Sequence, residues 1–157
     1  MSETVRVLVI DDDENIRKVV TAILEDEGYT VESVDTAKKG IEKSEKSFYN
    51  LALIDVRLPD MQGIELLAKL RDTKPKMRKI IVTGYPTLQN AVAAVNQGAD
   101  AYVMKPFDVE KLLRTIKEQL QKQTEERRFN EAKVAEFIET RVKELDALDE
   151  VKVRGRV

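Results

Sequence analysis

A chain of 157 residues, of which 42% are hydrophobic, is long enough for one folded domain with a short extension. The formal net charge of −2 excludes a general electrostatic attraction to nucleic acid or to an anionic membrane. The chain has no cysteine and no histidine, so thiolate and imidazole chemistry is excluded and carboxylates, hydroxyls and lysines remain. It also lacks a signal-peptide core and an apolar run that could span a bilayer, so we expect a cytoplasmic protein without membrane insertion.

The chain begins with a nearly continuous apolar and β-branched run, residues 5–10, which ends in Asp11 and Asp12. This pattern predicts a buried strand that is followed by acidic residues. An amphipathic helix follows, with Asp13 or Asp12 as its N-cap and Gly28 at its end. Its apolar positions recur with the helical period and are Ile16, Val19, Val20, Ile23 and Leu24.

The next three elements lead to a second acidic strand end. Residues 29–34 alternate between apolar and polar side chains, which predicts a strand at the edge of a sheet. Residues 36–46 form a weaker helical pattern. Residues 51–55 are apolar up to Asp55, which predicts a strand that is buried on both faces and has a carboxylate at its end.

A third helical pattern begins after Gly63, extends to Arg71 and ends before Pro75. A fourth strand is predicted at residues 79–83, and a fourth helix at about 87–97, closed by Gly98. The fifth strand, residues 101–104, leads to Lys105 and a final helix. Because strands and helices alternate strictly, we predict a parallel sheet with helices on both faces.

The chain is predicted to divide into three parts. Residues 1–123 form the predicted domain, 124–150 a helical extension and 151–157 a flexible tail. The extension has an apolar stripe that nothing in the domain is predicted to cover, formed by Val134, Phe137, Ile138, Val142, Leu145 and Leu148. A lone helix of this length is marginal in water, so we expect a homodimer through a short helical bundle. Folding back onto the domain and linkage to a lost output domain are the alternatives.

Polar side chains gather where the parallel strands end, which is where open α/β sheets bind ligands. These side chains are Asp11, Asp12, Asp55, Thr83 and Lys105. Three neighbouring carboxylates repel one another unless a cation neutralises them, and without histidine or cysteine the fitting cation is Mg²⁺. A carboxylate can attack a phosphoryl group, while a lysine and a threonine hydroxyl stabilise the phosphoryl oxygens. The residue types are therefore compatible with phosphoryl transfer to an aspartate, although each alone is also typical of a helix cap, a strand residue or a surface charge.

Four motifs resemble the receiver domain of two-component response regulators in order and spacing. They are Val9-Ile10-Asp11-Asp12-Asp13, Leu53-Ile54-Asp55-Val56-Arg57-Leu58-Pro59-Asp60-Met61-Gln62-Gly63, Ile81-Val82-Thr83-Gly84 and Tyr102-Val103-Met104-Lys105-Pro106-Phe107. The resemblance covers residues 5–123 and implies a flavodoxin-like, doubly wound five-stranded parallel sheet of order 2-1-3-4-5. It implies a switch that a partner sensor histidine kinase phosphorylates and that acts on a downstream effector protein.

The resemblance also implies the role of each site residue. Asp55 is the implied phosphoacceptor. The implied Mg²⁺ ligands are Asp11, Asp12, Asp55 and the backbone carbonyl of Arg57. Thr83 is the implied switch hydroxyl, Tyr102 the switch aromatic residue and Lys105 the lysine that pairs with the phosphoryl group. Receivers typically have a cis peptide bond at the position of Lys105-Pro106, so we expect one here.

Two other functions are weighed against this one. A phosphatase of the haloacid dehalogenase type also uses strand-end Asp, Thr and Lys with Mg²⁺, but nothing after Met104 supplies its second acidic pair. A purely structural dimerisation module would leave Asp55 inert. Nothing after Gln123 resembles a DNA-reading module, so we expect no direct nucleic-acid contact.

Overall fold

Five parallel strands form one sheet in the order β2-β1-β3-β4-β5, so the predicted fold class is confirmed. The computed structural model describes residues 4–154, with side chains up to residue 150. The described elements are β1 (Arg6–Ile10), α1 (Glu14–Asp26), β2 (Thr30–Val34), α2 (Ala37–Lys46), β3 (Leu51–Asp55), α3 (Gly63–Leu66), β4 (Arg78–Thr83), α4 (Leu88–Asn96), β5 (Ala101–Met104) and α5 (Val109–Arg154). The half-polar strand β2 lies at one edge, as predicted.

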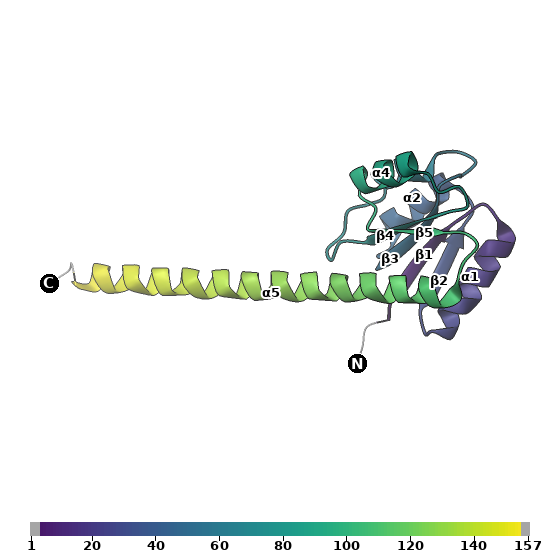
Figure 1. Cartoon of the computed structure of the whole chain (residues 1–157). Coiled ribbons are helices and arrows are strands. Elements are labelled where there is room, and N and C mark those ends of the chain that lie inside the picture. Colours follow the sequence, from purple (N-terminus) through teal and green to yellow (C-terminus); the bar gives the residue numbers. More distant parts are fainter. Residues whose placement is uncertain (1–3, 155–157) are drawn as a thin grey trace. The chain divides into compact units, whose positions relative to one another are not determined.

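Helices lie on both sides of the sheet (Figure 1). The strands β1, β3 and β4 separate two apolar cores, one on each face of the sheet. One face packs against α2, α3 and α4, and its largest buried side chains include Tyr49, Leu66 and Leu67. The other face packs against α1 and the first turns of α5, through Leu24, Leu112 and Ile116. Successive strand residues point to opposite faces, so a strand buried on both faces must be apolar at every position.

The strand register brings the expected site residues to one edge of the sheet. Ile10 is paired with Ile54, which places the residues after β1 beside the end of β3. Asp55 is paired with Val82, and Thr83 is paired with Met104. Because all of these pairings are parallel, the carboxyl ends of four strands meet at this edge.

Helix α3 is shorter than its apolar period predicts, and beyond its end side chains bond to two backbone groups that a continued helix would pair. The Arg71 amide donates to Ser44 Oγ at 3.2 Å, and the Leu67 carbonyl accepts from the buried Lys79 ammonium at 2.7 Å. These two backbone groups would otherwise bond to each other in the next helical turn. The segment from Leu67 to Leu70 is turn rather than helix, although its leucines are buried.

The chain divides into two compact units, one ending at Gln123 and one beginning at Thr124. Helix α5 continues to Arg154, four residues into the segment expected to be a flexible tail, and residues 155–157 lie outside the described residues. In the described part of the second unit, the apolar stripe residues are 46% to 70% exposed. None of the described helices meets the length and hydropathy that a membrane span requires.

Candidate functional site

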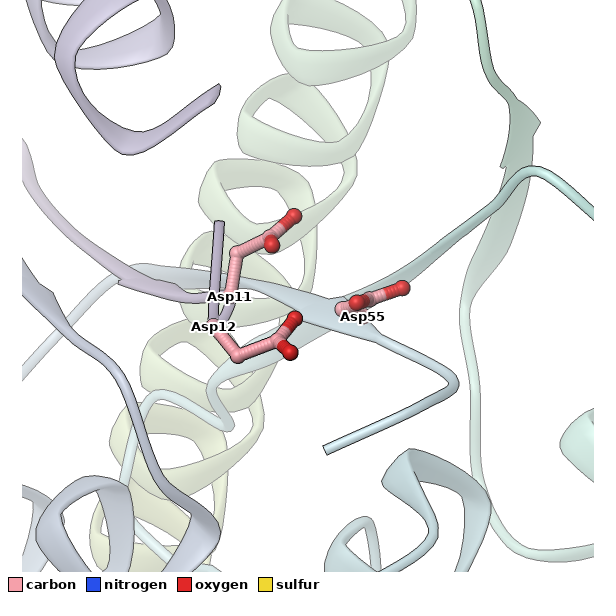
Figure 2. A group of neighbouring side chains, drawn as sticks. All are labelled: Asp11, Asp12 and Asp55. Atoms are coloured by element: carbon pink, nitrogen blue, oxygen red, sulfur yellow. The ribbon is translucent and has the colours of Figure 1, made fainter. Parts of the chain in front are cut away.

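Three carboxylates meet beyond the ends of β1 and β3. Asp11 and Asp12 follow β1, Asp55 is the last residue of β3, and one carboxylate oxygen from each lies within 4.8 Å of the others (Figure 2). Asp11 is buried at 4% exposure, Asp55 is largely buried and Asp12 is exposed. The site therefore has one carboxylate open to solvent and two carboxylates that depend on protein groups for their hydrogen bonds.

Three hydrogen bonds hold the backbone around Asp11, and the first runs from the Asp11 amide to the Val34 carbonyl at 3.1 Å. The Asp13 amide donates to Asp11 Oδ1 at 2.9 Å, and the Arg17 guanidinium donates to the Asp11 carbonyl at 2.7 Å. Asp13 also caps α1, because its carboxylate accepts from the amides of Asn15 and Ile16. The acidic run of residues 11–13 thus both caps α1 and orients the Asp11 carboxylate.

Lys105 connects the two buried carboxylates. Its Nζ lies 2.8 Å from Asp11 Oδ2 and 3.5 Å from Asp55 Oδ1, and its side chain is 16% exposed. The expected cis bond between Lys105 and Pro106 is confirmed. The Lys105 amide donates to the Thr83 carbonyl at 2.7 Å, which continues the pairing of β4 with β5 up to the site. A single positive side chain is thus shared by two carboxylates.

The surroundings of Asp55 raise its pKa. Burial, followed by the negative charge of Asp11, raises the pKa of Asp55 from 3.8 to about 6, although Lys105 and the Arg57 amide oppose this change. A cation placed among the carboxylates would offset the repulsion that contributes to this rise in pKa. The donor set consists of hard carboxylate oxygens only, and such donors suit Mg²⁺. The residues present therefore fit a magnesium ion.

Thr83 ends β4, and Tyr102 lies on the neighbouring strand β5. Thr83 is 1% exposed, and its Oγ1 accepts a hydrogen bond from the Tyr85 amide at 3.0 Å. Tyr102 packs against the core that α2, α3 and α4 cover. Its hydroxyl oxygen is buried and has no hydrogen-bond partner among the described residues. A buried hydroxyl without a partner typically costs about 1 to 3 kcal/mol, so this position of the ring carries an energetic penalty.

The loop between β3 and α3 contains interactions that the sequence analysis did not identify. A Cβ on Gly63 would collide with the Asp55 carbonyl oxygen, so only glycine lets α3 start this close to the site. The backbones of Arg57 and Gln62 form an isolated antiparallel bridge that closes the loop. The Asp60 carboxylate points away from the loop and accepts hydrogen bonds from two backbone amides of α2. Two sequence signals could have predicted a tight loop here. They are the Pro59-Asp60 turn and the glycine before a helical pattern.

Arg57 also makes a contact that bridges two loops. Its guanidinium carbon lies 3.9 Å from the centre of the Tyr85 ring, a cation–π contact between the loops that follow β3 and β4. Arg57 and Tyr85 are both exposed side chains. No sequence signal pairs two residues so far apart in the chain.

The family model and the similar proteins identify the same family. The sequence matches the family model described as response regulator receiver domain over residues 7–117. Response regulator ArlR from Staphylococcus saprophyticus is 34% identical over 118 residues, which are 75% of this chain and 53% of the relative. The chain thus spans about half the length of the curated relatives it matches.

Solved structures extend this similarity to the fold. A CheY-like response regulator receiver domain protein from Methanospirillum hungatei JF-1 is 50% identical with a TM-score of 0.75, covering 79% of this chain and 99% of that one. A response regulator from Burkholderia pseudomallei, solved with a phosphorylated aspartic acid, a calcium ion and citrate, is 30% identical with a TM-score of 0.68. That match covers 78% of this chain and 72% of the other.

Proposed function

Because the chain belongs to the receiver-domain family of response regulators, we propose that it is a signalling switch that accepts a phosphoryl group on Asp55. The observation that carries this proposal is the position of Asp55 within 4.8 Å of two further carboxylates, with Lys105 at 3.5 Å. No other described cluster of three acidic residues could hold a metal ion. The phosphorylated aspartic acid and calcium ion of the Burkholderia relative support the same chemistry.

The proposed reaction is a direct transfer between nucleophiles. A carboxylate oxygen of Asp55 attacks the phosphorus of a phosphohistidine on a sensor histidine kinase, and a P–O bond forms as the P–N bond breaks. The electron pair of that bond stays with the imidazole, and Asp55 becomes an acyl phosphate. Lys105 and the Thr83 hydroxyl stabilise the charge on the phosphoryl oxygens. The protein catalyses only this step and the later hydrolysis of its own acyl phosphate.

Asp11, Asp12 and Asp55 would hold the magnesium ion, with the backbone carbonyl of Arg57 as the further proposed ligand. When bound, Mg²⁺ supplies positive charge that offsets the charge on the carboxylates and on the incoming phosphoryl group. Lys105 then has one carboxylate fewer to neutralise, which leaves its ammonium available for the phosphoryl oxygens.

Thr83 and Tyr102 are the proposed switch residues. The dianionic group on Asp55 attracts the Thr83 hydroxyl, whose oxygen holds the Tyr85 amide, so the β4–α4 loop shifts with it. The unpartnered Tyr102 hydroxyl gives that ring an energetic reason to change position. The altered surface then binds a downstream effector protein. The sensor kinase takes its phosphoryl group from ATP, which is a cytoplasmic compound. We therefore propose that the transfer to Asp55 takes place in the cytoplasm.

Intact-mass measurement tests the proposal. With Mg²⁺ and acetyl phosphate, the chain should gain one phosphoryl group, and chelator or Asp55→Asn should abolish the gain. Glu65→Gln is the control, because it neutralises an exposed acidic side chain in the first turn of α3. An unchanged gain in Asp55→Asn would show that another residue is the nucleophile. A phosphatase would instead release many phosphates per chain from an aryl phosphate, which a receiver does not do.

The helical extension, residues 124–150, is proposed to make the protein a homodimer. Its apolar stripe includes Phe137, which is 70% exposed, and Ile138, which is 55% exposed. An exposed stripe of this kind is stable in water when a second apolar surface covers it. Light scattering should give a dimer for the full chain at tens of micromolar and a monomer for Phe137→Glu. Ala147→Glu adds the same charge outside the stripe and should remain dimeric. If the full chain is a monomer, the extension has another role.

A further inference from the structure

The Asp60 carboxylate reaches from the loop beside the phosphorylation site to the start of another helix. Its Oδ1 accepts from the Ala37 amide and its Oδ2 accepts from the Lys38 amide, both at 2.9 Å. These two amides belong to the first turn of α2 and have no acceptor within the helix. The two hydrogen bonds hold the pKa of Asp60 below its usual range. The carboxylate is therefore held in its charged form by a helix 22 or 23 residues away.

Asp60 lies at the tip of a closed loop that begins at Asp55. The Arg57–Gln62 bridge and the hydrogen bond from the Gly63 amide to the Val56 carbonyl, at 2.7 Å, close the base of this loop. Arg57 follows Asp55 by two residues, and the bridge at the base of the loop fixes its backbone. The loop thus has one fixed end at the site and one fixed tip at α2. A displacement of the tip would change the position of Arg57.

Helix α2 is a firm anchor for that tip. Gly40 brings the helix so close to β1 that a Cβ there would meet the Ile10 side chain. Asp11 directly follows Ile10, so the anchor is tied to the strand that supplies the other site carboxylates. The chain also supplies a local cap, because Thr36 Oγ1 accepts from the Lys39 amide at 3.1 Å. Thr36 thus caps α2 locally, whereas Asp60 caps the same helix from a distance and connects it to the β3–α3 loop.

We propose that Asp60 is a positioning residue, which anchors the β3–α3 loop to α2 and so holds the Arg57 backbone against Asp55 for cation binding. This inference rests on the proposed function for its magnesium readout. Asp60 is turned toward α2, so its effect on the cation is indirect. Residues that orient metal ligands from outside the coordination sphere typically change metal affinity by about tenfold or more when they are removed.

The chain offers a matched control for this experiment. Asp60→Ala and Thr36→Ala each remove side-chain acceptors from the first turn of α2, but only Asp60 belongs to the site loop. Isothermal titration of the full chain with Mg²⁺ should show a dissociation constant about tenfold higher for Asp60→Ala and unchanged within about twofold for Thr36→Ala. Asp60→Asn keeps one acceptor oxygen and should fall between the wild type and Asp60→Ala.

A second readout is independent of magnesium. In chelator, amide hydrogen exchange in residues 56–62 should accelerate in Asp60→Ala and stay at the wild-type rate in Thr36→Ala. Equal changes in both variants, or none in Asp60→Ala, would overturn the inference and leave Asp60 as a helix cap only. If the wild type neither binds Mg²⁺ nor gains a phosphoryl group, the proposed function fails, and the exchange result still decides whether Asp60 anchors the loop.

Discussion

Replacing Asp55 with Asn should stabilise the metal-free protein at neutral pH. Burial and Asp11 raise the pKa of Asp55 from 3.8 to about 6 in the folded state. Between these two values the folded protein binds more protons than the unfolded chain, so its stability falls as the pH rises through this window. The charged carboxylate therefore opposes folding most strongly above pH 6. Asparagine has nearly the same shape and no charge, so it removes that cost.

The size of the effect follows from the two pKa values. Each unit between them corresponds to about 1.4 kcal/mol, so the cost at about pH 7.5 is roughly 3 kcal/mol. At about pH 4.5 most folded molecules already carry the proton, and linkage reduces the cost to about 1 kcal/mol. The side chain of Asp55 is only 11% exposed, so solvent screening leaves much of this effect in place.

Urea denaturation in chelator at both pH values measures the difference. Asp55→Asn should exceed the wild type in free energy of unfolding by about 3 kcal/mol at the higher pH and by about 1 kcal/mol at the lower one. Asp60→Asn is a control of opposite sign, because its pKa is lowered in the folded state and its charge stabilises the protein. A gain that is the same at both pH values would show that packing, not charge, explains the result. No gain at the higher pH would refute the reasoning.

Three further predictions concern the site. Millimolar Mg²⁺ should raise the melting temperature of the wild type and not of Asp12→Ala, because the ion binds the folded state in preference; equal responses would exclude Asp12 as a ligand. Gly63→Ala should lower the free energy of unfolding by about 2 kcal/mol or more through its collision with the Asp55 carbonyl. Gly84→Ala, whose Cβ would only touch Lys105 at 3.9 Å, is the control, and equal losses would contradict the collision. Lys105→Met should raise the pKa of Asp55 above about 6 in an NMR titration, since Lys105 lowers it; a fall would reverse the assigned sign.

The sequence by itself determined the order of elements and the edge at which the chemistry lies. Apolar runs such as residues 51–55 are buried on both faces only in a parallel sheet, and strict alternation with helices leaves few ways to connect such strands. Once the strands are parallel, Asp11 and Asp55 must end at the same edge because each directly follows a buried run. These inferences depend only on the spacing of apolar and acidic residues along the chain, which is visible in the sequence.

Only the tertiary structure decided which distant groups meet at that edge. Beyond helix α3, Ser44 and Lys79 bond to the Arg71 amide and the Leu67 carbonyl, which would bond to each other in a continued helix. Asp60 caps α2, Arg57 lies on Tyr85, and Lys105 reaches Asp11 across 94 residues of sequence. The period of apolar residues can be identified in a short stretch of sequence. The contacts between distant residues depend instead on strand register and on the path of each loop. A polar side chain satisfies its hydrogen bonds with whichever partner the finished fold brings within about 3 Å.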